Sequence, residues 1–296
     1  MARRRKGRPV DGWLIVDKPA GIGSTQVVGR LRRALDARKA GHAGTLDPDA
    51  TGLLAIAFGE ATKTVPVAQD GLKTYDFAIR FGAETTTDDA AGEITQTSGA
   101  RPADAQIEAA LPDLTGDVMQ VPPSVSAVHV DGRRAYDLAR EGVAPDLAAR
   151  PLHVARLALT ARPDADTAHL TMTCGKGGYV RAIARDLGRA LGTRAHVLWL
   201  RRTAAGPFAL PAPTLAEAEA DPGAHLRPIE AALPDWPRLT ATEEGAVRLA
   251  NGNPGACLGD APAGVRAYAV RDGRALAMGR WMGGLLHPAR VFVRPA

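Results

Sequence analysis

The sequence predicts an α+β protein that ends in a small β-barrel-like module. Residues 75–81 alternate between large apolar side chains and smaller or charged ones, which is typical of a half-buried strand. Residues 180–191 repeat apolar positions every three or four residues, which predicts a helix ended by Gly192. Helices and strands alternate irregularly, and about 60 C-terminal residues form short apolar runs between glycine-rich turns.

The N-terminal elements follow from turn and capping residues. Residues 13–16 form a short apolar run that Pro19 and Gly21 stop, which indicates a strand and a turn. A helix should follow, capped by Ser24 or Thr25, because apolar and basic positions then separate onto different faces.

Later elements are assigned in the same way. Residues 84–93 are polar and read as a loop, whereas residues 154–159 and 170–174 read as a pair of strands. The helix at 180–191 carries arginines every four residues on a second face, at 181, 185 and 189. Such a row is usually solvated, so Arg185 and Arg189 are expected in solvent or against phosphate. Residues 207–237 are rich in Pro, Ala and acidic residues, and indicate a helix and a connector before a domain boundary.

Composition limits the class of protein. A chain of 296 residues with 45% hydrophobic and 23% charged residues is typical of a folded protein that is not embedded in a membrane. No apolar run reaches the ~18 residues that cross a bilayer, and no apolar segment follows the N-terminal charges as in a secretory signal. Cys174 and Cys257 lie far apart, which disfavours disulfides and zinc and suits the cytoplasm.

The net charge of +5 is concentrated at the N-terminus. Residues 1–8 hold five cations and no acid, so the rest of the chain has 32 residues of each sign. This basic arm, residues 1–9, is either a solvated tail or a segment that binds polyanions.

Several catalytic motifs are absent from the sequence. It contains no P-loop, no H-E-x-x-H and no G-x-S-x-G motif. Nucleotide-hydrolysing and metal-dependent enzymes are therefore disfavoured, and no cofactor or metal is expected.

Asp47, in the stretch GHAGTLDPDATGLL, has two interpretations. Asp-Pro is a common turn, in which Asp bonds the backbone and Pro fixes φ. The neighbouring Gly41, Gly44 and Gly52 allow tight backbone paths, and a carboxylate held there could act as a nucleophile if a cation keeps it ionised.

This stretch also carries a resemblance to a known family. KAGHAGTLDPDATGLLAIAFGEATK resembles the catalytic signature of the TruB family of tRNA pseudouridine synthases. WLIVDKPAGIGST, TYDFAIRFGAETTTDDAAGE, CGKGGYVRAIARDLG and AHVLWLRR resemble further blocks of the family, in order and at its spacing. The resemblance covers most of the chain and implies a mixed, largely antiparallel sheet in the catalytic domain.

The resemblance implies three catalytic residues. Asp47 would be the nucleophile, attacking either the ribose C1′ or the uracil C6. Tyr75 would stack on the flipped uracil, although packing with other aromatic residues of its strand is the alternative. Arg181 would pair with Asp47, although a solvated helix cation is the alternative.

Five substrate-binding residues are implied as well. Leu200 would cap the uracil, and Lys18, Lys176 and Tyr179 match positions near the pocket. His42 would stack into the RNA loop as the base leaves, although a single histidine is more often structural.

The resemblance also divides the chain into domains. Residues 10–236 would form the catalytic domain, with an RNA-clamping insertion at about 120–150, and residues 237–296 would form a PUA-like RNA-binding domain. Within the insertion the chain departs from the family, because Val125 replaces the usual aromatic residue and His129 a frequent lysine. Phosphate contacts there are expected from three residues, Arg133, Arg134 and Arg140.

The resulting hypothesis is a cytoplasmic, monomeric synthase that converts the TΨC-arm uridine of tRNA, position 55, without a protein partner. Two alternatives stay open. The chain could be an RNA-binding or tRNA-folding protein whose catalysis is dispensable, or a guide-RNA-dependent synthase.

Overall fold

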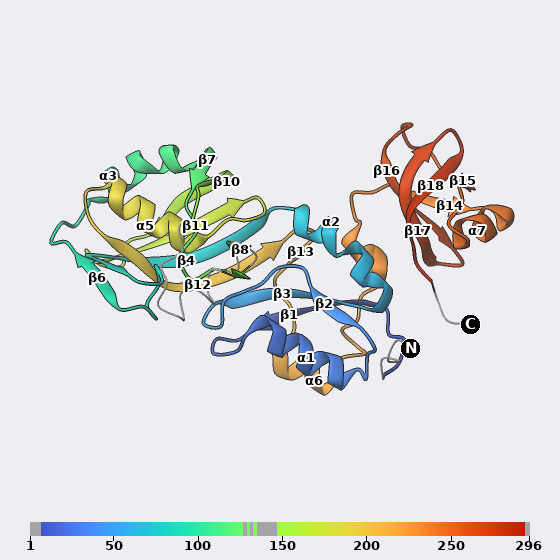
Figure 1. Cartoon of the computed structure of the whole chain (residues 1–296), viewed down its shortest axis with the longest axis horizontal. Coiled ribbons are helices and arrows are strands. Elements are labelled where there is room, and N and C mark those ends of the chain that lie inside the picture. The colour runs from blue at the N-terminus through green and yellow to red at the C-terminus, as the bar shows by residue number, and fades with distance from the viewer. Residues whose placement is uncertain (1–6, 127–128, 131–132, 135–146, 294–296) are drawn as a thin grey trace.

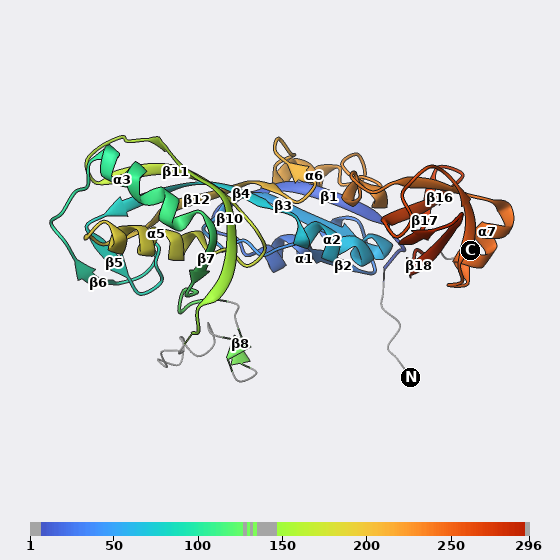
Figure 2. The same cartoon turned by 90° about the horizontal axis from the view of Figure 1, so that it is seen from above.

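The computed structural model describes residues 7–126, 129–130, 133–134 and 147–293. Figure 1 shows one long mixed sheet with helices packed against it and a separate barrel at one end, and the view from above in Figure 2 shows the same elongated arrangement. None of the helices in this described part of the chain has the length and apolar character of a membrane-spanning segment. The predicted α+β class with a C-terminal barrel is confirmed.

The main sheet has the order β1-β3-β12-β4-β11-β10-β7, and β3 and β12 form its one parallel pair along this path of described strands. These strands are β1 (Gly12–Lys18), β3 (Thr51–Phe58), β12 (Ala195–Ala205), β4 (Lys73–Phe81), β11 (Thr167–Cys174), β10 (Arg150–Ala161) and β7 (Gly116–Gln120). Short strands β2 (Ala40–His42) and β13 (Phe208–Ala209) extend β3 and β12. The largely antiparallel sheet is thus confirmed.

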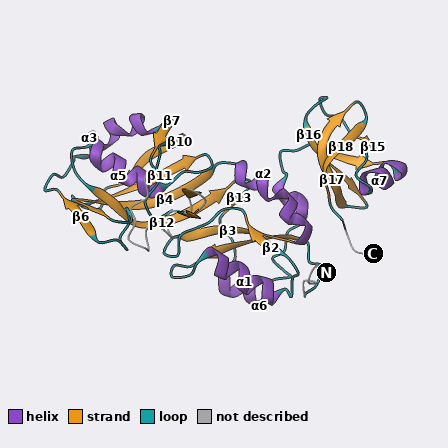
Figure 3. Cartoon of the chain, viewed as in Figure 1, coloured by secondary structure: helices purple, strands orange, loops and turns teal. Residues whose placement is uncertain are grey.

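Helices cover the sheet in two groups, which Figure 3 colours purple. Apolar residues of α5 (Val180–Ala190) and α3 (Asp104–Ala110) pack with β4, β11 and β10 in one core cluster. Residues of α1 (Ser24–Ala34) and α6 (Leu215–Ala220) pack with β1 and β3 in another. The site described below lies where these two halves of the sheet meet, at the β3–β12 pair.

The remaining elements are short connections and hairpins. They are the 3₁₀ segments Gly59–Thr64, Leu111–Leu114 and Ile229–Ala232, the helix α2 (Val65–Asp70), and the hairpins β5 (Ala83–Thr85)–β6 (Ile94–Thr97) and β8 (His129–Val130)–β9 (Arg133–Arg134).

A closed barrel of five strands ends the described chain. Its strands are β14 (Arg238–Ala241), β15 (Gly255–Leu258), β16 (Arg266–Arg271), β17 (Arg274–Met282) and β18 (Leu285–Val291), with α7 (Glu243–Ala250) alongside. One apolar cluster joins Trp13 and Phe208 of the main sheet to Tyr268 and Met278 of the barrel. The boundary near residue 236 stays a prediction, but this shared core means that the barrel packs directly on the sheet.

Expectations about polar side chains were wrong for the cap of α1 and for Arg185, and incomplete for Arg189. Neither Ser24 nor Thr25 caps α1, because Gly23 occupies the N-cap position, and the Ser24 hydroxyl instead exchanges two hydrogen bonds of 2.8 Å with the backbone of Leu46. Arg185 is not a solvated cation, because it is buried and pairs with Asp88, whereas the half-exposed Arg189 reaches solvent as expected but also pairs with Glu84. Their partners lie about 100 residues away, so helix periodicity alone could not show them.

The basic arm is described only at its end. Residues 1–6 lie outside the described residues. The backbone N–H of Arg8 donates to the Asp36 carbonyl at 2.6 Å, and its guanidinium, on a side chain that is 68% exposed, donates to the Leu35 carbonyl at 3.2 Å.

Candidate active site

Asp47 lies in the loop between β2 and β3. The Ala50 N–H donates to the Asp47 carbonyl at 3.2 Å, so the Asp-Pro turn forms as its residue types favour. The turn leaves the side chain free to face a different partner. The structural and the functional interpretation of Asp47 are therefore compatible.

The partner of the Asp47 carboxylate is Arg181. Arg181 lies in the first turn of α5, and its Nη2 is 3.0 Å from Asp47 Oδ2. The Arg181 side chain is 7% exposed, whereas that of Asp47 is 45% exposed. A buried guanidinium thus holds one side of the carboxylate and leaves the other side accessible.

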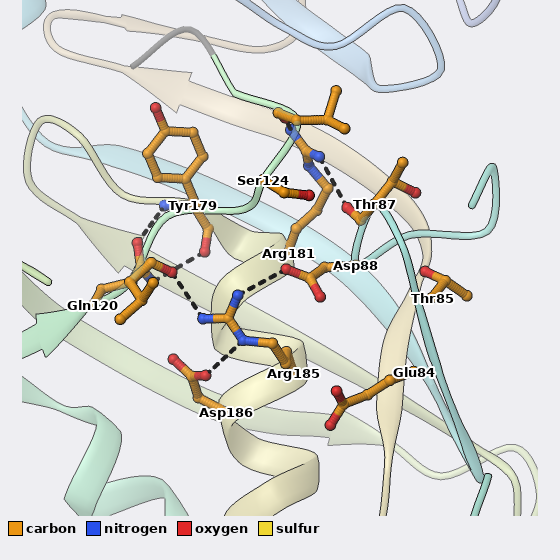
Figure 4. Close-up of polar contacts among 12 residues, drawn as sticks. Glu84, Thr85, Thr87, Asp88, Gln120, Ser124, Tyr179, Arg181, Arg185 and Asp186 are labelled. Carbon is orange, nitrogen blue, oxygen red and sulfur yellow. Dashed lines mark hydrogen bonds and ion pairs between the residues drawn. The ribbon is translucent and has the colours of Figure 1, made fainter. Parts of the chain in front are cut away.

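Arg181 is itself held on several sides. Its Nη1 donates to the Thr87 carbonyl at 2.9 Å and lies 3.6 Å from Asp89, and its Nη2 donates to the Val125 carbonyl at 3.0 Å. Figure 4 shows the bond to Thr87. Contacts from two further loops therefore fix the direction of the guanidinium toward Asp47.

A cavity of about 320 Å³ opens beside this ion pair, which is within the size range of small-ligand sites. Its walls include Tyr75 of β4, Leu200 of β12, and Lys176 and Tyr179 from the segment before α5. Tyr75 is 9% exposed, and burial raises the pKa of its hydroxyl while the charge of Arg202 partly offsets this effect. Tyr75 is therefore an uncharged aromatic surface at neutral pH.

Tyr179 and Lys176 have contrasting surroundings. The Tyr179 backbone exchanges two hydrogen bonds with the Gln120 side chain, at 2.9 and 3.1 Å, as Figure 4 shows, and burial raises the pKa of its hydroxyl. The Lys176 ammonium is 65% exposed and lies 3.4 Å from Asp70. Tyr179 is thus a fixed part of the wall, whereas Lys176 lies at the rim.

Lys18 and His42 are not among the residues that line the cavity. The Lys18 ammonium is buried and donates to the carbonyls of Pro19, Ile22 and Pro48, each at 2.8 Å. All three of its N–H groups are therefore satisfied, and one of them fixes the residue that follows Asp47.

His42 lies behind the same loop. Its Nδ1 accepts a hydrogen bond from the Gly44 N–H at 3.3 Å. Burial and the positive charge of Arg202 lower the pKa of His42, so its imidazole is neutral near pH 7. Its proposed stacking on RNA stays a prediction.

Arg202 is a functional candidate that the sequence interpretation missed. It is 3% exposed, and it donates to the carbonyls of Gly44 (3.1 Å), Thr45 (3.2 Å) and Leu53 (2.9 Å), which lie on both sides of Asp47. It also lines the cavity. The signal was present, because positions 200 and 202 of a strand share a face and Leu200 was placed in the pocket.

Two of the three glycines expected to allow tight backbone paths do so. Gly52 has φ +99°, and a Cβ there would lie 2.2 Å from the Arg202 carbonyl. Gly44 has φ +147°, whereas Gly41 has neither a left-handed φ nor a close neighbour. The close approach at Gly52 is what brings the Asp47 loop against β12.

The remaining candidates for chemistry near the site are the Cys174 thiol and any group of side chains that could bind a metal ion. Burial raises the pKa of the Cys174 thiol to about 11, so it is protonated at neutral pH. The part of the chain that the structure describes contains no group of three His, Cys, Asp or Glu side chains placed to hold a metal ion. Arg140 of the predicted RNA clamp lies outside the described residues. The phosphate contacts of Arg133 and Arg134 stay predictions.

Comparison with known proteins identifies a family that this arrangement fits. The sequence model for the TruB family pseudouridylate synthase (N terminal domain) matches residues 32–180, and that for the tRNA pseudouridylate synthase B C-terminal domain matches residues 181–233. A protein of Paracoccus denitrificans (strain Pd 1222) named tRNA pseudouridine synthase B is 60% identical over 98% of each chain. The protein of the same name from Ruegeria pomeroyi is 57% identical over the whole of both chains.

Solved structures share the fold at lower identity. A chain of a Cbf5-Nop10-Gar1 complex superposes with a TM-score of 0.72 at 22% identity, covering 95% of this chain and 85% of that one. A chain of an H/ACA RNP bound to a substrate RNA containing 2′-deoxyuridine gives 0.72 at 19% identity, covering 99% and 92%. These likenesses support the fold described above.

Proposed function

The chain belongs to the TruB family of pseudouridylate synthases, and we propose that it isomerises the uridine at position 55 of the tRNA TΨC arm to pseudouridine. The observation that carries this proposal is the Asp47–Arg181 ion pair beside a cavity walled by Tyr75 and Leu200. This combines an accessible carboxylate with an aromatic and an apolar surface for a flat base.

The reaction rearranges bonds without a co-reactant. The bond between N1 of uracil and C1′ of ribose breaks, the base turns within the site, and C5 bonds to C1′. The proton on C5 leaves, and N1 gains a proton. Asp47 would provide the nucleophile, at either C1′ or C6, and Arg181 would keep its carboxylate ionised and directed.

The uridine must leave its stack to reach Asp47, since the carboxylate lies at the wall of a cavity. Unstacking costs a few kcal/mol, and stacking on an aromatic side chain returns roughly 1–3 kcal/mol. Tyr75 would supply that surface, and Leu200, on the neighbouring strand, a further apolar contact. The RNA loop and the tRNA phosphates would supply the remaining binding energy.

We also propose that the enzyme acts in the cytoplasm, as a monomer, on tRNA alone. The 54–60% identical relatives are named for tRNA, whereas the resemblance to the chains of the Cbf5-Nop10-Gar1 complex and the H/ACA RNP is one of fold only. Activity on a bare tRNA transcript without a second protein would support this proposal. A requirement for a guide RNA would contradict it.

Tritium release from C5-labelled uridine tests the reaction directly, because only loss of the C5 hydrogen frees the label. We expect release from an unmodified tRNA transcript with the wild-type protein, and none above background with Asp47→Asn. Binding of tRNA without release by the wild type would instead favour the RNA-binding alternative. The Asn variant keeps the size of the side chain, so tRNA binding serves as its control.

A further inference from the structure

Arg185 lies one helical turn after Arg181 on α5 and is buried, at 8% exposure. We propose that Arg185 and Asp88 form a positioning pair that holds the two loops around Arg181 and thereby keeps Arg181 directed at Asp47. The inference rests on the proposed function, since it assigns a role in that reaction.

Each of the three nitrogens of the Arg185 guanidinium donates a hydrogen bond. Its Nη1 donates to Asp88 Oδ2 at 2.9 Å, its Nε to Asp186 Oδ1 at 2.9 Å, and its Nη2 to the Val121 carbonyl at 2.8 Å, as Figure 4 shows for the labelled carboxylates. The side chain of Asp88 is also buried, at 10% exposure, and burial raises the pKa of its carboxyl. A buried charge pair of this kind is costly to break because the remaining partner is left unpaired.

Arg181 and Arg185 bind the same two segments of the chain. Arg181 contacts Thr87 and Asp89, and Arg185 contacts Asp88 between them. In the second segment, Arg181 binds the Val125 carbonyl and Arg185 binds the Val121 carbonyl. A shift of either segment would therefore displace the ligands of both arginines.

Asp88 is the point where the first segment changes direction. Its φ is +59°, a left-handed conformation that is uncommon outside glycine and that aspartate adopts more readily than most residues. This backbone turns the side chain of Asp88 toward Arg185 while the Thr87 carbonyl and the Asp89 carboxylate face Arg181. Without Arg185, we expect this turn to relax and Arg181 to lose its orientation.

The two segments are also joined to each other. The Ser124 hydroxyl donates to the Thr86 carbonyl at 3.0 Å, and Gln120 holds the backbone of Tyr179 at the start of α5. Residues 86–89, residues 120–125 and the first turns of α5 thus form one connected unit. Arg185 is buried at its centre.

Arg189 provides a matched control on the same helix. It pairs with Glu84 through two hydrogen bonds, at 2.9 and 2.7 Å, and among the described residues it forms no hydrogen bond or ion pair with residues 87–89 or 121–125. Glu84 keeps a second cation, Arg194, at 3.5 Å. The Arg189 side chain is 52% exposed, so removing it takes away a more exposed ion pair of the same helix without releasing the ligands of Arg181.

The test compares Arg185→Gln, Asp88→Asn and Arg189→Gln in single-turnover conversion of uridine in a tRNA transcript. Varying the enzyme concentration gives two quantities for each variant, namely the maximal conversion rate and the enzyme concentration at half of that rate. The melting temperature of each variant is measured in parallel. We expect a 10- to 100-fold lower maximal rate for Arg185→Gln, because a misplacement of about 1 Å costs up to 10²-fold. The half-saturating concentration should change less than threefold, and Arg189→Gln should react within twofold of wild type.

Asp88→Asn keeps the shape of the side chain and tolerates the left-handed backbone, so it tests the proposal even if Arg185→Gln fails to fold. It should lower the maximal rate three- to tenfold. A folded Arg185→Gln that reacts within twofold of wild type would overturn the proposal, as would an Asp88→Asn with the wild-type rate or an equal loss in Arg189→Gln. Absence of conversion by the wild type would instead contradict the proposed function itself.

Discussion

Replacing Arg202 with methionine should impair both stability and catalysis. Arg202 donates to the carbonyls of Gly44, Thr45 and Leu53, and methionine would retain the buried stem while removing every donor. A buried carbonyl without a partner costs about 1–3 kcal/mol, and the guanidinium would no longer need to be desolvated. The net loss in free energy of unfolding should therefore be about 3 kcal/mol, the lower end of the sum over three carbonyls.

For a chain of this size, that loss corresponds to a fall in melting temperature of about 6–12 °C, at roughly 2–4 °C per kcal/mol. The rate of uridine conversion should fall by about 100-fold. The three carbonyls lie on both sides of Asp47 in the sequence, so losing their hydrogen bonds should move the loop, and a shift of about 1 Å in the carboxylate has an effect of that size. Thermal unfolding followed by circular dichroism and single-turnover conversion below the melting range measure the two effects separately.

Arg201→Met on the same strand is the control. Arg201 pairs with Asp17 but is 37% exposed, and exposed pairs contribute about 0–1 kcal/mol. Its melting temperature and rate should stay near those of the wild type. An Arg202→Met protein that is folded and reacts within twofold of wild type would refute the idea that Arg202 positions the Asp47 loop.

Two further predictions concern pH and salt. In the folded state the pKa of His42 lies below its ordinary value, so the unfolded chain binds the proton first and the free energy of unfolding should fall as the pH decreases below about 6.5. Denaturant unfolding at pH 7 and pH 5 should show a smaller fall in His42→Asn than in the wild type. An equal fall in both proteins would contradict the lowered pKa of His42. Residues 1–6 hold four cations, and their deletion should make the affinity for tRNA less dependent on salt. The slope of log affinity against log salt concentration should become shallower by about one unit for each phosphate that the arm neutralises in the wild type. An unchanged slope would show that the arm is a solvated tail.

Local patterns predicted much of the fold. Alternation at residues 75–81 gave β4, and helical periodicity gave α5 with its apolar face in the core. These features depend on neighbours a few positions apart, which a single sequence displays directly. The family resemblance then indicated Asp47, Arg181 and Tyr75 as candidate catalytic residues, and the structure brings all three to one cavity.

The polar interior was harder to predict because its partners are distant in sequence. Arg185 looked like a surface cation on α5, yet Asp88 and Val121 bury it from two loops. The Lys18 ammonium binds three backbone carbonyls that the sequence did not indicate, and its contact with substrate stays a prediction. Charged residues are usually exposed to solvent, so a sequence alone predicts them at the surface. The hydrogen-bond acceptors that permit their burial lie on loops distant in sequence and are seen only in the folded structure.

The most direct test of the central claim is a map of pseudouridine in one unmodified tRNA transcript after treatment with the wild type and with Asp47→Asn. If the carboxylate of Asp47 performs the chemistry, the wild type will produce pseudouridine at position 55 and the Asn variant, although it still binds the transcript, will produce none. Pseudouridine at that position in the Asn-treated transcript would contradict the account.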